Sequence, residues 1–473
     1  MGAPQHCDLL IKNGCVLTMD VRRLVIPQGA VAVKGHTIAA VGPERDILRD
    51  WHAAETIDAR GGIVHPGYVD AHLHVNAQTC RGFFRGDASK GAGQGGPNYA
   101  DWKASLTADD EHAAAGLASV EMLRHGITTY VEPGSAFEPD AVADATESVG
   151  VRCSLAEPYL WDTTDIMSAI PGLASESLFA RVPPRRERCM KLLGSQLFRN
   201  RNRDGITHGH IALYGEGTAT DELYIAAKTL ADREGVILNN HVGFDLDLAA
   251  AMERVYGKSR FLHFAEIGVL GPNTTFVHMN LIRDDEIAPI VKSGLSIIWC
   301  PLAYVSRGTT LRQHTRIPAM KKLGVNVALG TDSARSSSSG DAGFLALQLA
   351  NGAGYNTVSE DILEMMTING ARAAGLQHLI GSLEPGKRAD IVVRSSGVAE
   401  LMPGIDPVHQ LVTVGHGPNA DTVLVNGRVV MQAGRPTRVN EADIFAKAQA
   451  SVRRIADRLG LSSPGIWPRL RAA

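Results

Sequence analysis

The sequence predicts an α/β protein built on a (β/α)8 barrel with a small β-sandwich beside it. Between about residues 66 and 380, short apolar segments alternate with amphipathic helical segments, which is typical of parallel β/α units. Eight such strands can be counted, and eight strands close a barrel. A β-rich segment before residue 65 has a near-copy after residue 420, so we expect both chain ends to supply strands to one small domain.

The expected barrel strands are separated by helices with clear start and stop signals. Thr107 and Asp110 can cap a helix that runs to Gly126, and Thr220 can cap one that ends at Gly235. An open, doubly wound sheet would show the same alternation, but polar residues recur at strand C-termini, where a barrel builds its site. The strands are expected at residues 63–74, 128–131, 153–156, 211–214, 236–241, 275–278, 296–300 and 325–329.

The chain is expected to divide into three parts. Residues 1–65 and 381–435 form the composite β-sandwich, because each contains an apolar strand that runs into an Asn-Gly turn. Residues 66–380 form the barrel. Residues 436–473 form a C-terminal tail with a helix at 441–459.

Composition excludes several classes of partner. The 473 residues carry a net charge of −3, which argues against a nucleic-acid-binding surface. No apolar run approaches the roughly 18–20 residues that a membrane span needs. The N-terminus lacks a basic region followed by an apolar core, and the six scattered cysteines are typical of reduced thiols. We therefore expect a cytoplasmic protein, and a homo-oligomer, without nucleic-acid or membrane partners.

Polar residues at the strand ends predict a metal site. His72 and His74 lie at the end of the first strand, and residues i and i+2 of a strand point to the same side. His241 and His278 end the fifth and sixth strands, and Asp332 follows the eighth. Each residue alone could be a structural histidine or a helix cap, but all five meet at one end of the predicted barrel. Imidazoles with one carboxylate suit Zn²⁺, with Fe²⁺ or Co²⁺ as alternatives.

Such a site predicts hydrolytic chemistry. A bound divalent ion lowers the pKa of its water towards ~7, which gives hydroxide at neutral pH. Asp332 can be both a ligand and a proton shuttle to a leaving nitrogen. His278 can polarise a substrate carbonyl or take a fourth nitrogen position on the ion.

The motifs of this chain resemble those of the amidohydrolase superfamily, in the branch of chlorohydrolases and ring deaminases. The resemblance implies a distorted (β/α)8 TIM barrel with a flanking β-sandwich, and metal-dependent hydrolysis. Besides the histidines of strands five and six, the motifs are Pro-Gly-Tyr-Val-Asp-Ala-His-Leu-His at 66–74, Gly-Thr-Asp at 330–332, Thr-Ile-Asn-Gly-Ala-Arg-Ala at 367–373 and Gly-Ser-Leu-Glu-Pro-Gly-Lys-Arg-Ala-Asp-Ile-Val at 381–392.

The resemblance also bears on the number of ions. Binuclear members of the superfamily carry a lysine at the end of strand four, and residues 211–217 contain none. One divalent ion per chain is therefore implied, although Glu216 could bridge a second. The implied ligands are His72, His74, His241 and Asp332.

The chain departs from the ring deaminases at Phe244. Those relatives carry a glutamate three residues after the strand-five histidine, which protonates the ring nitrogen. Phe244 cannot transfer a proton, so ring deamination is disfavoured and an apolar substrate face is expected. Asn239 precedes His241 by two residues and points the same way, either to orient a ligand or to approach the ion. An Asn-x-His here resembles the small group of phenylurea hydrolases and molinate hydrolase.

The predicted function is hydrolysis of the carbonyl C–N bond of a urea, carbamate or amide by metal-bound hydroxide. The expected substrate is small, neutral and apolar, an N,N-dialkyl phenylurea herbicide, so the role is xenobiotic degradation. Thiocarbamate (molinate) hydrolysis and ring deamination or dechlorination are the alternatives, and a non-enzymatic relative would not need the strand-end residues. Candidate pocket residues are Phe83, Phe84, Trp102, Tyr159, Trp161, Phe244, Trp299 and Tyr304.

Overall fold

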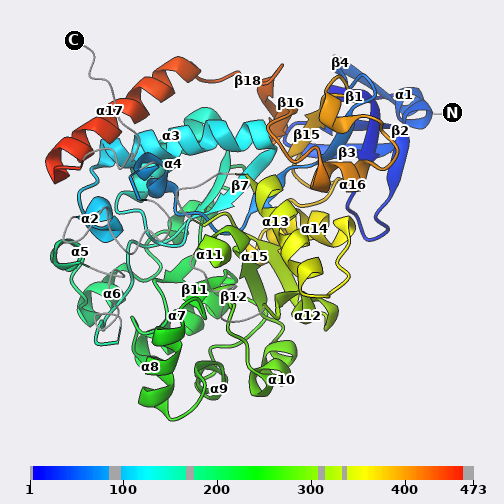
Figure 1. Cartoon of the computed structure of the whole chain (residues 1–473). Coiled ribbons are helices and arrows are strands. Elements are labelled where there is room, and N and C mark those ends of the chain that lie inside the picture. The colour runs from blue at the N-terminus through cyan, green and yellow to red at the C-terminus, as the bar shows by residue number, and fades with distance from the viewer. Residues whose placement is uncertain are drawn as a thin grey trace, which may run out of the picture.

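The computed structural model describes residues 4–81, 83–84, 97–166, 175–306, 315–332 and 338–461. A barrel of parallel strands surrounded by helices makes up most of it, and a separate sheet lies against one side (Figure 1). In Figure 1 the blue N-terminal strands and the orange C-terminal strands lie side by side in that sheet. The glycine-rich stretch at 91–96 lies outside the described residues.

The barrel consists of a four-stranded and a five-stranded parallel sheet that meet at both edges. Strand four is interrupted at His210, whose N–H donates to Leu155 O (3.0 Å) and so joins the two sheets. At the other edge Asp332 N donates to His72 O (3.0 Å), and His74 N donates to Asp332 O (2.9 Å). The predicted (β/α)8 barrel is thereby confirmed. Its strands are β6 (Tyr68–Asp70), β7 (Ile127–Val131), β8 (Arg152–Leu155), β9 (Thr207–Gly209), β10 (Ile211–Leu213), β11 (Leu238–Val242), β12 (Thr274–His278), β13 (Ser296–Trp299) and β14 (Asn326–Leu329).

The second sheet has nine strands and joins both ends of the chain. β1 pairs antiparallel with β2 and parallel with β4 and β5, and β5 pairs antiparallel with β15. The β5–β15 pairing thus connects the N-terminal strands to the C-terminal ones. The strands are β1 (Gln5–Leu17), β2 (Val25–Lys34), β3 (Thr37–Pro43), β4 (Trp51–Asp58), β5 (Ile63–Pro66), β15 (Ile391–Arg394), β16 (Ala420–Val425), β17 (Arg428–Gln432) and β18 (Arg435–Pro436).

The prediction of one continuous strand at 63–74 is wrong, because the structure has two separate strands there. β5 belongs to the nine-stranded sheet and β6 to the barrel, and the chain turns between them at Gly67. A Cβ atom on Gly67 would lie 1.9 Å from Thr128 Oγ1, so only glycine fits this close approach. His72 and His74 consequently follow β6 instead of lying within it.

Replacing Gly67 by alanine should destabilise the protein by about 2–3 kcal/mol, because the added methyl group overlaps the buried Thr128 side chain. Urea unfolding measures the change. Gly352→Ala is the matched control, since a Cβ atom at the end of α13 meets no atom within 4 Å. Equal stability of the two variants would contradict the close packing at Gly67.

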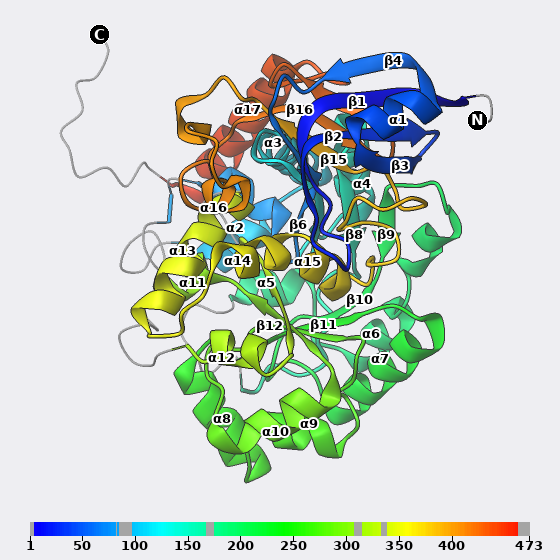
Figure 2. The same cartoon turned by 90° about the vertical axis from the view of Figure 1, so that its right-hand side faces the viewer.

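Helices cover the outside of the barrel, with α7 to α10 at its lower end in Figure 2. The capping expectations are confirmed: Thr107 and Asp110 cap α3, which ends at Gly126, and Thr220 caps α7, which ends at Gly235. The helices are α1 (Glu44–Asp50), α2 (Tyr99–Ala104), α3 (Ala108–His125), α4 (Pro139–Val149), α5 (Glu176–Arg181), α6 (Arg186–Leu192), α7 (Asp221–Glu234), α8 (Leu246–Tyr256), α9 (Arg260–Glu266), α10 (Asp284–Ser293), α11 (Pro301–Ser306), α12 (Ile317–Lys322), α13 (Ser339–Gly352), α14 (Ser359–Met366), α15 (Ile368–Ala373), α16 (Pro407–Thr413) and α17 (Glu441–Leu459), with short 3-10 helices at Val75–Cys80, Leu197–Arg201 and Ala399–Leu401.

The C-terminal helix α17 has the predicted bounds and packs along α3 (Figure 1). Ser451 Oγ donates to Asp110 Oδ1 (2.7 Å), and Arg454 also binds that carboxylate (3.0 Å). Asp110 therefore caps α3 and holds α17 at the same time. Among the helices of the described ranges, none is both long and apolar enough to cross a membrane.

Candidate metal centre and active site

The structure brings the five predicted strand-end residues together at the C-terminal mouth of the barrel. The ring centroid of His72 lies 4.9 Å from that of His74, 4.8 Å from that of His241 and 5.9 Å from that of His278. Asp332 Oδ1 lies 3.5 Å from His74 Nε2 and 3.8 Å from His72 Nε2. All five side chains are buried.

These side chains fit a metal ion. Two overlapping sets, His72–His241–His278 and His72–His74–Asp332, each place their ligand atoms within 4.8 Å of one another. Neither ring nitrogen of His72 has a hydrogen-bond partner among the described residues. Burial holds the pKa of His72 well below its usual range, and the surrounding imidazoles add to that shift. A neutral imidazole offers its lone pair, so this donor set suits zinc or a similar divalent ion.

Buried hydrogen bonds fix the orientation of two of the imidazoles. His74 Nδ1 lies 2.8 Å from Ser135 Oγ, and that hydroxyl donates to the buried carboxylate of Glu132. His241 Nδ1 is hydrogen-bonded to Tyr214 O. Both contacts leave the Nε2 atoms facing each other, 3.2 Å apart, towards the centre of the cluster. Outer partners of this kind hold a ligating histidine in one tautomer and one orientation.

The junction between the first and last strands positions Asp332. Thr331 N donates to Asp70 Oδ1 (3.0 Å), and the Thr331 hydroxyl donates to the other oxygen of that carboxylate. His72 N also donates to Asp70 Oδ1 (3.2 Å). Burial, with the charge of Asp332 as a smaller cause, raises the pKa of Asp70 to about 7. Asp332 itself has a left-handed φ of 64°, an uncommon conformation that this network holds in place.

His278 closes the cluster on the side of strand six. It also has a left-handed φ, 77°, and its ring lies 5.6 Å from that of His241. The Phe244 ring packs against it at 5.5 Å. Ring deaminases of the superfamily carry a glutamate at the position of Phe244. In this chain a hydrocarbon ring therefore lies next to the candidate metal centre.

Two buried polar residues lie deeper in the barrel. Strand alternation places Asn239 on the same face as His241, and both atoms of its side-chain amide lack a hydrogen-bond partner among the described residues. His210 Nδ1 lies 2.9 Å from Ser154 Oγ, and burial lowers the pKa of His210 to about 3. Sequence reasoning missed His210, because it lies at an interruption within a strand and not at a strand end.

Glu216, the candidate bridge to a second ion, has other partners. Its carboxylate forms a buried ion pair with Arg260 (2.5 Å) and accepts a hydrogen bond from Gly243 N (3.0 Å). An acid already neutralised by a buried guanidinium is a poor ligand for a second cation. Glu216 is therefore occupied by Arg260 and Gly243 and is not placed as a free ligand.

The predicted pocket residues other than Phe244, which lies beside His278, are spread over four different places. Tyr159 packs with Trp161 at 5.0 Å between ring centroids and with Phe137 at 4.9 Å, on the side of strand four. Phe83 and Phe84 pack against Trp102 beneath α17.

Strand alternation separates the remaining aromatic residues. Ile298 points into the barrel, so Trp299 packs outwards among the helices, away from the histidines. Tyr304 is buried in α11, which directly follows β13.

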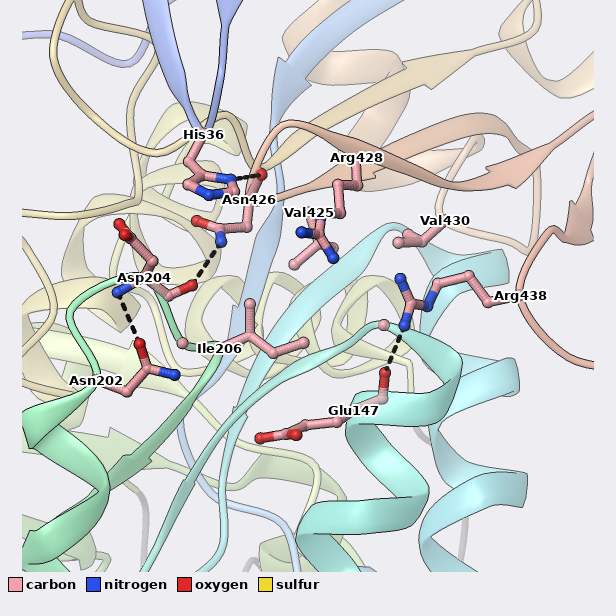
Figure 3. A pocket seen from close by; sticks show the side chains of 12 residues that line it. His36, Glu147, Asn202, Asp204, Ile206, Val425, Asn426, Arg428, Val430 and Arg438 are labelled. Atoms are coloured by element: carbon pink, nitrogen blue, oxygen red, sulfur yellow. Dashed lines mark hydrogen bonds between the residues drawn. The ribbon is translucent and has the colours of Figure 1, made fainter.

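A cavity of about 350 Å³ lies away from this site, between the nine-stranded sheet and the barrel (Figure 3). Glu147, Gly150 and Ile206 on its wall precede β8 and β9, so it opens at the N-terminal ends of the barrel strands. Catalytic groups of such barrels gather at the opposite end. This cavity contains none of the predicted site residues.

Comparison with known proteins agrees with this geometry. Residues 63–430 match the model of the amidohydrolase family. The chain is 30% identical to 5-methylthioadenosine/S-adenosylhomocysteine deaminase of Symbiobacterium thermophilum, over 94% of this chain and 99% of that one. It is 28% identical to 5'-deoxyadenosine deaminase of Methanosarcina mazei, over 96% and 99% of the two chains.

Solved structures share the fold. A zinc-bound adenosine deaminase from Xanthomonas campestris superposes with a TM-score of 0.80 at 23% identity, covering 96% of this chain and all of that one. Zinc-bound atrazine chlorohydrolase from Arthrobacter aurescens superposes with a TM-score of 0.77 at 23% identity, covering 94% and 100%.

These matches decide the enzyme class but not its subgroup. The narrower resemblance to phenylurea and molinate hydrolases is not confirmed, because the full-length relatives named above are deaminases. The chain is an enzyme that hydrolyses carbon–nitrogen bonds other than peptide bonds. With the family model matched over most of its length, it belongs to the amidohydrolase family.

Proposed function

We propose that this enzyme displaces a nitrogen leaving group from a planar, sp²-hybridised carbon of its substrate. The convergence of four imidazoles and the Asp332 carboxylate at the barrel mouth carries the proposal. A divalent ion held by His72, His74, His241 and Asp332 would supply an activated water as the nucleophile. Zinc is the first candidate, one ion per chain.

Two protein groups would then move protons and charge. Asp332 can take the proton of the attacking water and return it to the departing nitrogen, because its carboxylate lies within 4 Å of two of the imidazoles. His278 can donate a hydrogen bond to the substrate atom on which negative charge develops. Its ring lies 5.9 Å from that of His72 and 5.5 Å from that of Phe244, which supports a role beside a substrate bound at the metal centre.

Deamination of a heteroaromatic ring is the first candidate reaction. Its support is the full-length similarity to enzymes named as deaminases of adenosine derivatives. The fold shared with an adenosine deaminase and an atrazine chlorohydrolase is consistent with it. These comparisons favour the ring reaction over hydrolysis of a phenylurea.

Phe244 is the specific reason to retain a second candidate, cleavage of the carbonyl C–N bond of a urea or thiocarbamate. A ring nitrogen needs a proton donor at the moment of attack, and a phenyl ring offers none. A carbonyl substrate places its developing charge on oxygen, which needs only the hydrogen bond from His278. The partly exposed Phe244 ring would then face the aryl or alkyl part of the substrate.

A substrate panel separates the candidates. Zinc-loaded protein is incubated with 5'-deoxyadenosine, adenosine, atrazine, diuron and molinate, and released ammonia, chloride and amine are quantified. Ammonia supports ring deamination, and an amine supports carbonyl cleavage. Chloride without ammonia or amine would identify a dechlorinase and contradict a nitrogen leaving group. Loss of turnover on metal removal, restored by zinc, is expected in either case. Turnover that survives complete metal removal would overturn the proposal.

Phe244→Glu should raise ring deamination relative to carbonyl cleavage by about 10²-fold or more, because it introduces the missing proton donor beside the site. The partly exposed position can accept a carboxylate. Steady-state kcat/KM for adenosine and diuron measures the ratio, and Phe244→Leu serves as the apolar control. An unchanged ratio in both variants would show that the residue at 244 does not select the reaction.

A further inference from the structure

Lys103 on α2 is a buried ammonium group close to the candidate metal centre. Only 3% of the residue is exposed. Its Nζ donates a hydrogen bond to Tyr214 Oη (2.8 Å). Among the residues that the structure describes, no carboxylate lies within ion-pair distance of Lys103.

Three tyrosine rings surround this ammonium. Nζ lies 4.9 Å from the ring centroid of Tyr99, 5.4 Å from that of Tyr159 and 5.2 Å from that of Tyr214. Aromatic faces partly replace the water that a buried cation has lost. They do not satisfy its N–H groups: an ammonium has three, and Tyr214 accepts one.

Two phenol hydroxyls beside Lys103 also lack partners. Tyr99 Oη and Tyr159 Oη are buried, and neither has a hydrogen-bond partner among the described residues. Tyr159 is completely buried. Buried polar groups in native proteins are nearly always hydrogen-bonded, so an ammonium and two hydroxyls left together indicate that a ligand completes them.

The cluster connects directly to the metal centre. Tyr214 accepts from Lys103 through its hydroxyl and from His241 through its backbone carbonyl, and its ring lies 5.8 Å from that of His241. Burial holds the pKa of Tyr99 well above its usual range, and nearby charges, including that of Asp332, add to the shift. Tyr214 thus lies between Lys103 and His241 and contacts both of them.

We propose that Lys103, with the hydroxyls of Tyr99 and Tyr159, binds an acceptor oxygen at the end of the substrate remote from the scissile bond. The inference rests on the proposed function, since it places the substrate between this aromatic wall and the metal centre. The substrate class becomes narrower: an aromatic compound that carries a carbonyl, ether or hydroxyl oxygen several bonds from the reacting carbon. A wholly hydrocarbon end would leave the Lys103 N–H groups unpaired, which costs affinity.

Binding of two isosteric probes tests this without turnover. Affinities of zinc-loaded protein for para-fluoroacetophenone and para-fluoro-α-methylstyrene, which differ only in C=O against C=CH₂, are measured by fluorine NMR. The wild-type protein should prefer the ketone by about tenfold. Lys103→Met should abolish the preference. Lys228→Met is the matched control, since Lys228 pairs with Asp232 on α7, and it should retain the preference.

The outcomes separate this inference from the proposed function. The role of Lys103 is overturned if the wild-type protein shows no preference for the ketone, or if the Lys103→Met variant keeps that preference. Either result counts even if the enzyme hydrolyses panel substrates. If the wild-type protein prefers the ketone and the Lys103→Met variant does not, the role of Lys103 is upheld even if no panel substrate is hydrolysed. Should Lys103→Met fail to fold, Tyr159→Phe decides. This variant removes an unpartnered hydroxyl, so it should fold normally and weaken ketone binding several-fold.

Discussion

Replacing Asp332 by asparagine should reduce kcat by at least about 10³-fold. The variant loses a negatively charged ligand of the ion and the group that carries the proton to the leaving nitrogen. The fold should survive, because the main-chain bonds of residue 332 to His72 and His74 close the barrel irrespective of its side chain. Turnover of the substrate identified by the panel, zinc content per chain and circular dichroism together measure the effect.

Asp144→Asn is the matched control for that experiment. Asp144 is largely exposed and pairs with His112 on the outside of the barrel, so its neutralisation should leave turnover unchanged. If the Asp332→Asn variant kept wild-type activity, the Asp332 carboxylate would not be needed for the reaction.

Asp390→Leu should destabilise the protein by about 3–5 kcal/mol, because it leaves the Arg152 guanidinium buried without its counter-ion. The two side chains form a bidentate pair at 2.9 and 3.0 Å, and both are almost completely buried. Asn426 N also donates to Asp390 Oδ1 (2.7 Å). This network joins barrel strand β8 to the C-terminal part of the nine-stranded sheet.

Urea unfolding measures that loss, and a double-mutant cycle isolates the pair. Arg152→Met should cost a similar amount, while the double variant Arg152→Met/Asp390→Leu should cost clearly less than the sum of the two single changes. Additive losses would show that the pair does not act as a unit.

The sequence was sufficient to predict the barrel and its strand-end residues for one physical reason. The C-terminal ends of parallel barrel strands meet at one mouth, so polar residues far apart in sequence, such as His74 and Asp332, had to converge. Alternation along a strand likewise explains Trp299: Ile298 faces the barrel interior, so its neighbour faces the helices. Trp299 therefore does not line the pocket, contrary to the expectation from the sequence.

Other parts of the site have no periodic signal. The contact of Ser135 with His74, and that of Lys103 of α2 with Tyr214, depend on how the segments between the strands fold back over the barrel mouth. The division of residues 63–74 into two strands depends on the close approach of Gly67 to Thr128, which an uninterrupted apolar pattern does not reveal. The subgroup was inferred from Asn239 and Phe244 alone, and two residues are too few to identify a substrate.

Anomalous diffraction at the zinc edge, from crystals of the zinc-loaded protein, tests the central claim most directly. We predict one strong peak per chain, within bonding distance of the Nε2 atoms of His72, His74 and His241 and of the Asp332 carboxylate. A peak elsewhere, a second peak beside Glu216, or no peak at the barrel mouth would contradict the single-ion hydrolytic centre.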